Sequence, residues 1–177
     1  MNQHPFPRLF ETERLWLRAT HSEDARFVLD LLNTPKWHQY IGDRGVRTVE
    51  DARRYIQDRM LPQLERLGFG NYTVIRKADG LKMGSCGLYD REGLEGVDIG
   101  FAFLPECEGQ GYGTESARKM KDLAFELFGV DRISGITVKE NLGSQRLLEK
   151  IGLKFIENIR LPNDPEEIML YRLDRPA

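Results

Sequence analysis

The sequence has 177 residues, of which 40% are hydrophobic and 31% are charged, the composition of a globular protein with a hydrophobic core. The formal net charge is −2, so no overall positive charge would attract nucleic acid or an acidic membrane surface. Two cysteines without a CxxC spacing and three scattered histidines, His4 among them, argue against a disulfide framework and a structural metal site. The chain opens without a signal-peptide pattern and has no apolar run of membrane-spanning length, so we expect a cytoplasmic protein.

Two helices are expected in the first third of the chain. A capping-box pattern at Thr20 and Glu23 opens the first helix, and Pro35 stops it. A loop or broken helix then leads to the second helix. Pro62 should kink or interrupt this helix, and Gly68 should end it.

Seven segments have the alternating or β-rich composition that is typical of strands. We expect strands at residues 13–18, 71–76, 81–88, 97–104, 132–138, 154–160 and 167–173. Two further helices are expected, one from Gly113 or Thr114 to Gly129 and one from Ser144 to Ile151. The order β-α-α-β-β-β-α-β-α-β-β predicts a single mixed α/β domain over residues 1–177.

A glycine-rich segment, Glu108-Gly-Gln-Gly-Tyr-Gly-Thr114, lies between the expected strand 97–104 and the helix after it. Glycines let the backbone approach a ligand closely, and the amides at the start of a helix carry partial positive charge. The segment therefore predicts an anion-binding nest. A Walker loop would need a lysine after Gly113, and a dinucleotide GxGxxG fingerprint would need a glycine at 114 or 116, so neither matches.

The alternative is that this segment is only a tight connection between a strand and a helix. Three carboxylates, Glu106, Glu108 and Glu115, would oppose a bound diphosphate. Exposed charge pairs usually contribute less than about 1 kcal/mol each. Hydrogen bonds from several amides to a charged acceptor contribute about 1.5–3 kcal/mol each, so we favour the anion site.

Residues 108–113 resemble the pyrophosphate-binding motif Gln/Arg-x-x-Gly-x-Gly/Ala of the GNAT N-acetyltransferase superfamily, with Glu108 in place of Gln or Arg. A second segment resembles the family's Asn-x-x-Ser … Lys-x-Gly-Phe pattern, in which Asn141 and Ser144 match. Gly-Gln-Gly-Tyr-Gly-Thr-Glu is particularly similar to the RimJ/RimL-like branch. The resemblance implies one mixed, mostly antiparallel sheet, splayed at its centre and flanked by helices.

The resemblance also implies acetyl-CoA as co-substrate and direct transfer of its acetyl group to a primary amine, either a protein N-terminal α-amine or a small molecule. Main-chain amides of the glycine loop would bind the coenzyme's pyrophosphate, and amides near Phe103 and Leu104 would hold the thioester carbonyl. The implied coenzyme-binding residues are Phe103, Leu104, Glu108, Gly109, Gln110, Gly111, Tyr112, Gly113, Thr114, Asn141 and Ser144.

Three residues are candidates for catalysis. Ser144 is expected to assist protonation of the departing thiolate, and Asn141 to cap its helix. Asp98 is a better-placed candidate for the general base than Glu106, which is expected to be solvated. Asp98 has the alternative role of an ion-pair partner for Arg91 or Arg132. A covalent role for Cys107 is not favoured, because no histidine is placed to activate it.

The acceptor pocket is expected to come from aromatic residues outside the two motifs. Trp37, Tyr40 and Tyr89 are the candidates, with core packing as the alternative role. A competing hypothesis for the whole chain is a non-catalytic acyl-CoA-binding regulatory module that keeps the cradle without turnover. Transfer assays over a panel of amines discriminate between the two.

Overall fold

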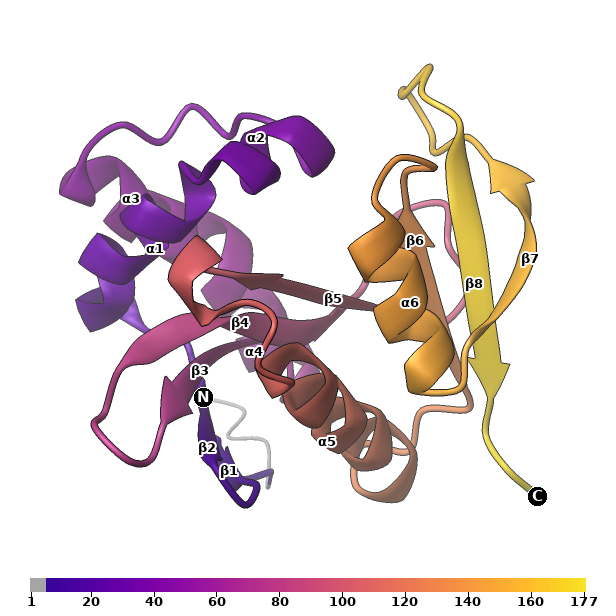
Figure 1. Ribbon diagram of the computed structural model, residues 1–177, viewed down its shortest axis with the longest axis horizontal. Coiled ribbons are helices and arrows are strands. Elements are labelled where there is room, and N and C mark those ends of the chain that lie inside the picture. The colour runs from indigo at the N-terminus through magenta and orange to yellow at the C-terminus, as the bar shows by residue number, and fades with distance from the viewer. Residues whose placement is uncertain (1–5) are drawn as a thin grey trace.

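One eight-stranded sheet organises the structure, a computed structural model that describes residues 6–177. His4 lies outside the described residues. The strand order is β1-β2-β3-β4-β5-β6-β8-β7 (Figure 1). The strands are β1 (Leu9–Glu11), β2 (Leu15–Ala19), β3 (Asn71–Arg76), β4 (Lys82–Tyr89), β5 (Val97–Phe103), β6 (Arg132–Thr137), β7 (Lys154–Ile159) and β8 (Ile168–Asp174). Every neighbouring pair is antiparallel except β5–β6, which is parallel.

Helices cover the sheet. They are η1 (Ser22–Asp24), α1 (Ala25–Leu32), α2 (Pro35–Tyr40), α3 (Val49–Tyr55), η2 (Ile56–Met60), α4 (Leu61–Leu67), η3 (Pro105–Cys107), α5 (Tyr112–Glu126) and α6 (Leu142–Lys150). The apolar face of α5, which includes Ala117, Met120 and Ala124, is buried in the main core with residues of β4 and β5. A second cluster joins α1 to α3. Among residues 6–177, no helix has the length and apolar composition needed to cross a membrane.

The first helical segment begins one residue later than the expected capping box. His21 and Asp24 form the box, with the His21 ring accepting from the Glu23 amide and Asp24 accepting from the His21 amide. Thr20 is not the cap because its hydroxyl is buried and lies 2.8 Å from the Thr73 hydroxyl. A contact across the sheet therefore decides between two adjacent capping patterns.

Two prolines each lie in the first turn of a helix. The helix α1 ends at Leu32, ahead of Pro35 as expected, and Pro35 itself begins α2, because it occupies the first turn, where a missing N–H costs nothing. The Thr34 hydroxyl caps that turn by accepting from the Trp37 amide. Pro62 interrupts the second helix as expected, since the π-helical turn η2 precedes it, and Gly68 ends α4 in the left-handed conformation.

The two central strands part after one short stretch of pairing. β5 and β6 are in register only at Val97 with Ile133 and at Asp98 with Ser134. Beyond this point β5 continues to Phe103 and β6 to Thr137 without pairing with each other. The result is a wedge between β5 and the unit of β6, β8, β7 and α6, which Figure 1 shows from its open side.

Candidate active site

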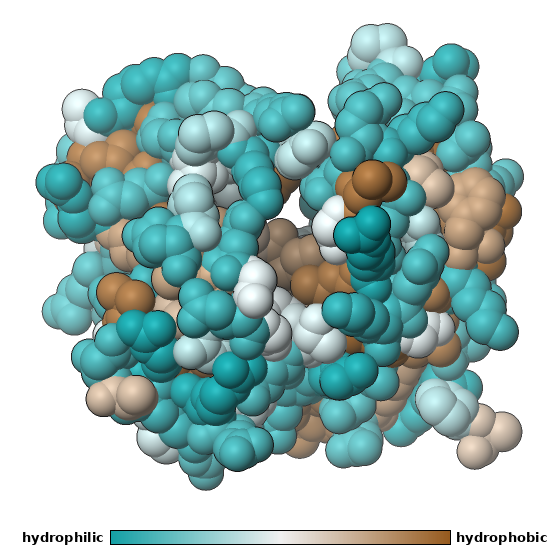
Figure 2. Space-filling view, in the orientation of Figure 1, coloured by the Kyte–Doolittle hydropathy of each residue, from teal (hydrophilic) through white to brown (hydrophobic). Residues whose placement is uncertain are grey.

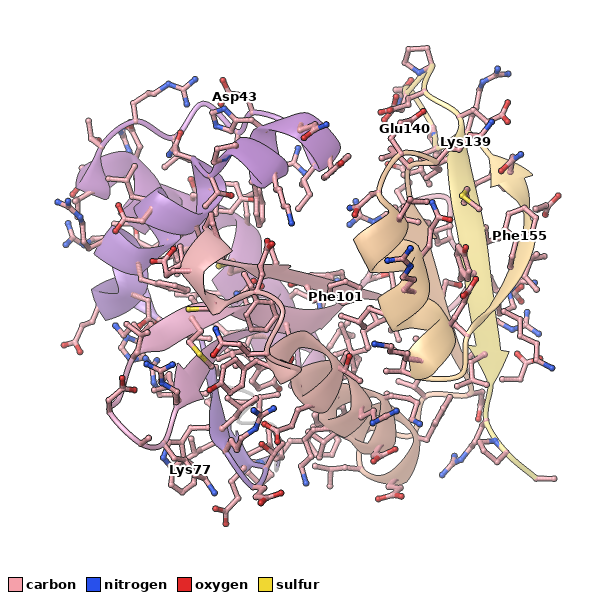
Figure 3. The ribbon with its side chains drawn as sticks, in the orientation of Figure 1. Asp43, Lys77, Phe101, Lys139, Glu140 and Phe155 are labelled. Carbon is pink, nitrogen blue, oxygen red and sulfur yellow. The ribbon has the colours of Figure 1, made fainter. Side chains whose placement is uncertain are left out.

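The wedge opens at the surface as a hollow with apolar residues at its floor (Figure 2). Phe101 lies in the middle of this opening, between the two halves of the molecule (Figure 3). Asp43 and the Lys139–Glu140 pair lie on opposite sides of its outer rim (Figure 3). Strands that diverge in this way leave main-chain groups of their facing edges without partners, and these groups are the first candidates for binding a ligand.

The direction of the β5 amides follows from its pairing with β4. The Leu104 amide donates to the Met83 carbonyl at 2.8 Å, so the hydrogen bonds to β4 fall on the even-numbered residues of β5. The amides of Phe101 and Phe103 therefore point toward the wedge. The expectation that the amides of Phe103 and Leu104 both hold the thioester carbonyl is therefore corrected for Leu104. The Leu104 amide already donates to the Met83 carbonyl.

The glycine loop follows β5 directly and leads into α5. Gly109 and Gly111 have φ of 74° and 83°, a conformation in which an L side chain would be strained. No described residue accepts a hydrogen bond from the amides of residues 109–114. These amides lie in an exposed turn and in the first turn of a 15-residue helix, a combination that suits a diphosphate.

Gly113 meets a different requirement from that of the other two glycines. A Cβ at this position would lie 3.0 Å from Leu147 Cδ1 of α6 and 3.7 Å from the Phe103 ring. The absence of a side chain lets α5 approach α6 and β5 at once. Gly113 thus sets the distance between the loop and the other side of the wedge.

Two of the three carboxylates near the loop have cationic partners. Arg14 forms an ion pair with Glu115 at 3.3 Å, donates to the Gln110 carbonyl at 3.1 Å and stacks on the Tyr112 ring at 4.3 Å. Glu108 pairs with Lys36 of α2. The negative charge that would oppose a diphosphate is therefore largely balanced within the protein.

The helix α6 brings Asn141 and Ser144 together at its start. The Asn141 side chain accepts from the Ser144 amide at 3.2 Å and so caps the helix, as the sequence predicts. Ser144 is half-buried in the first turn, and among the described residues its hydroxyl has no hydrogen-bond partner. That hydroxyl is available to a ligand.

Asp98 lies at the apex of the wedge, where β5 and β6 separate. It is 2% exposed, and only one of its carboxylate oxygens is paired, with Arg91 Nε at 2.8 Å from Oδ2. Oδ1 is buried without a partner in the described part of the chain. Burial raises the pKa of Asp98 to about 6, although the Arg91 charge opposes the rise.

The three aromatic candidates for the acceptor pocket come from two elements. Trp37 and Tyr40 are half-buried on α2, and the Trp37 indole nitrogen is buried without a partner among the described residues. Tyr89 ends β4, and its hydroxyl donates to Asn71 Oδ1 at 2.5 Å. No described contact joins Tyr89 to the two residues of α2.

The cysteines are poorly suited to nucleophilic chemistry. Burial raises the pKa of Cys86 to about 12 and raises that of Cys107 as well. Both are free and buried. A thiol with a raised pKa carries little thiolate at neutral pH, so neither cysteine is suited to act as a covalent acyl carrier.

Comparison with known proteins decides the family. The acetyltransferase (GNAT) domain matches residues 14–154, which include both strands of the wedge, the glycine loop and the start of β7. The chain belongs to the GNAT acetyltransferase family. It is an acetyl-CoA-dependent acetyltransferase, and the predicted fold, one mixed and mostly antiparallel sheet splayed at its centre and flanked by helices, is confirmed.

Several relatives match this GNAT chain over most of their own length. The uncharacterized N-acetyltransferase YnaD of Bacillus subtilis is 27% identical over 143 residues, 81% of each chain. The structure of an acetyltransferase from Agrobacterium tumefaciens is similar with a TM-score of 0.80 at 22% identity, covering 99% of both chains. RimL, a ribosomal L7/L12 alpha-N-protein acetyltransferase in complex with coenzyme A, has a TM-score of 0.79 at 16% identity, covering 94% of this chain and 98% of that one.

Three further residues of this GNAT site have no signal in the local sequence. Phe101 gains its role from the pairing of Leu104 with β4, which sets the direction of its amide. Arg14 and Lys36 reach the glycine loop from positions 96 and 72 residues away from their partners. The sequence around the glycine loop does not reveal Arg14 or Lys36, because only the fold brings these two residues to the loop.

Proposed function

We propose that this chain transfers the acetyl group of acetyl-CoA to a protein N-terminal α-amine by direct attack in a ternary complex. The observation that carries the proposal is Asp98, a buried carboxylate with one free oxygen and a pKa raised to about 6, at the apex of the wedge. An amine attacks only as the neutral base. A carboxylate at this place is suited to take up the proton that the amine must lose.

The basicity of the acceptor favours an α-amine over a lysine side chain. Deprotonation at pH 7 costs about 1–1.4 kcal/mol for an α-amine with a pKa of about 7.7–8.0. It costs about 4.6 kcal/mol for a lysine with a pKa of about 10.4. A single carboxylate that titrates near pH 6 is a sufficient base for the first case and a weak one for the second.

Each part of the wedge has a separate task in this proposal. Acetyl-CoA supplies the activated thioester. The amides of residues 109–114 hold the diphosphate, and those of Phe101 and Phe103 donate to the carbonyl oxygen as it gains negative charge. Ser144 Oγ gives a proton to the departing sulfur. Asp98 lies three residues from Phe101, about 10 Å along an extended strand, so it takes up its proton through water.

The α-amine acceptor is also in keeping with two resemblances. The Gly-Gln-Gly-Tyr-Gly-Thr-Glu segment is similar to the RimJ/RimL-like branch, and the fold is similar to that of RimL, which acts on a protein α-amine. Trp37, Tyr40 and Tyr89 are proposed to line the acceptor pocket. We further propose that residues 1–177 act as one domain in the reducing cytoplasm, where Cys86 and Cys107 stay unpaired.

Thiol release with acetyl-CoA and a panel of amines tests the proposal. Peptides with a free N-terminus are expected to be acetylated, whereas the same peptides with a blocked N-terminus and an internal lysine are not. Faster turnover of polyamines or amino acids would overturn the α-amine assignment and keep the reaction class. Tight coenzyme binding without transfer to any amine would favour the regulatory module. The buried cysteines should keep the protein's own thiol signal low.

A further inference from the structure

Glu108 puts a carboxylate at the start of the diphosphate loop. It directly precedes Gly109, the first residue of the run of free amides, and 33% of its side chain is exposed. A negative charge at this place opposes a bound diphosphate, and the opposition grows as the distance shortens. The family motif has Gln or Arg here, so this chain needs another source of compensation.

Lys36 supplies the compensating charge. It belongs to α2, 72 residues earlier in the chain, and its ammonium group pairs with the Glu108 carboxylate. The Thr34 cap and Pro35 in the first turn hold the backbone of this residue. The pair therefore ties α2 to the loop, and Figure 1 shows α2 above η3 at the mouth of the wedge.

The geometry points to Lys36 as a positioning residue for recognition of the diphosphate. It cancels the charge of Glu108 and so makes the amides of the loop able to accept a dianionic group. The same ion pair holds α2, which carries Trp37 and Tyr40, against the coenzyme loop. This inference rests on the proposed function in two respects, namely acetyl-CoA in the loop and α2 as a wall of the acceptor pocket.

A double-mutant cycle separates charge cancellation from direct contact with the phosphate. Lys36→Gln leaves Glu108 uncompensated and is expected to weaken coenzyme A binding about fivefold in calorimetry at low salt. Glu108→Gln alone is expected to leave the affinity equal or higher. The double variant is expected to bind within about twofold of Glu108→Gln. A double variant as weak as Lys36→Gln, or a Lys36→Gln protein with unchanged affinity, overturns the inference.

Two controls show whether the effect belongs to the diphosphate. S-acetylpantetheine carries the thioester without the diphosphate, so at saturating acceptor Lys36→Gln should lower kcat/KM for acetyl-CoA and leave kcat/KM for this donor unchanged. Arg53→Gln removes an exposed cation of α3 that pairs with Glu50, and it should change kcat/KM with neither donor. Equal losses with both donors would mean that Lys36 only supports the fold of α2.

The double variant also tests the tie between α2 and the loop. It restores the charge balance without restoring the ion pair, so the KM for the acceptor should rise while the affinity for coenzyme A stays normal. An unchanged acceptor KM contradicts the tie. If the wild-type protein binds no coenzyme A, the proposed function fails and this inference with it. If it binds coenzyme A and only the Lys36 effects are missing, the inference alone fails.

Discussion

Arg91 and Asp98 form an ion pair that uses only one of the two carboxylate oxygens. Arg91 Nε lies 2.8 Å from Oδ2, while Oδ1 is buried and has no partner among the described residues. Arg91 comes from the loop between β4 and β5 and is partly exposed, with 38% of its side chain accessible. The ion pair therefore holds Asp98 in place and leaves Oδ1 free to accept a proton, the role proposed for this carboxylate in the wedge.

The rate of transfer should depend on the ionisation of Asp98. Since only the carboxylate accepts a proton, kcat/KM is expected to rise with pH through about 6, the pKa of Asp98. Arg91→Gln removes the charge that lowers this pKa, so the acidic limb of the profile should move to higher pH. Arg26→Gln, an exposed cation on α1 that pairs with Asp30, is the matched control and should leave the limb in place. A limb that stays put in Arg91→Gln would exclude Asp98 as the titrating base.

Asp98 should lower the stability of the protein at neutral pH. Its pKa is raised from 3.8 to about 6 on folding, so the folded state binds its proton more tightly than the unfolded state does. Stability is therefore lost as pH rises from about 4 to 6, by an amount on the order of 2–3 kcal/mol. Asp98→Asn should raise Tm at pH 7.5 and not at pH 3.5, while lowering kcat by about 100-fold or more. A lower Tm at pH 7.5 would contradict this account.

Asp24 is a buried aspartate that should behave in the opposite way. Burial raises its pKa, but hydrogen bonds from Arg18, Lys82 and the His21 amide lower it more, and the net result is well below 3.8. Its contribution to stability is therefore present above pH 4 and lost as pH falls below that value. Asp24→Asn should cost about 3 kcal/mol at pH 7, measured by urea unfolding, because it leaves two cations without their carboxylate. Equal losses at pH 7 and pH 3 would contradict the charge argument.

Gly109 and Gly80 form a matched pair for testing the loop. Both have positive φ, 74° and 75°, and an added Cβ would meet nothing within 4 Å at either site. Alanine should therefore cost about 1–2 kcal/mol of stability at both positions. Only Gly109→Ala should also weaken binding of coenzyme A, because Gly80 belongs to the turn between β3 and β4. Equal affinities of the two variants in calorimetry would remove Gly109 from the diphosphate site.

The features that the sequence predicts best are those made by neighbouring residues. The Asn141 cap, the end of α4 at Gly68 and the amide run of residues 109–114 each depend on a few consecutive positions. Strand β1, which has three residues and little burial, has no alternating pattern and was not predicted. Its position depends on pairing with β2, which the residues of the segment alone do not predict.

The features that the sequence does not predict depend on contacts between distant elements. The Thr73 hydroxyl on β3 moves the capping box by one residue, since it engages Thr20. The pairing of Leu104 with Met83 turns the amide of Phe101, and not that of Leu104, toward the wedge. Lys36 meets the loop only because α2 folds over it. In each case, local propensity allows several arrangements and tertiary packing selects one.

Ser144 and Asn141 can be tested separately, because one is proposed to act on the leaving group and the other on the helix. Ser144→Ala removes the hydroxyl and keeps the amide that the Asn141 side chain caps, so kcat should fall about 10-fold or more while Tm stays the same. Asn141→Ala removes the cap and should cost about 1 kcal/mol of stability. Asn141→Asp keeps an acceptor at the same place and should retain the stability that Asn141→Ala loses. If Ser144→Ala lowers Tm as much as Asn141→Ala and leaves kcat unchanged, the hydroxyl serves the helix, and the proton for the departing thiolate must come from solvent.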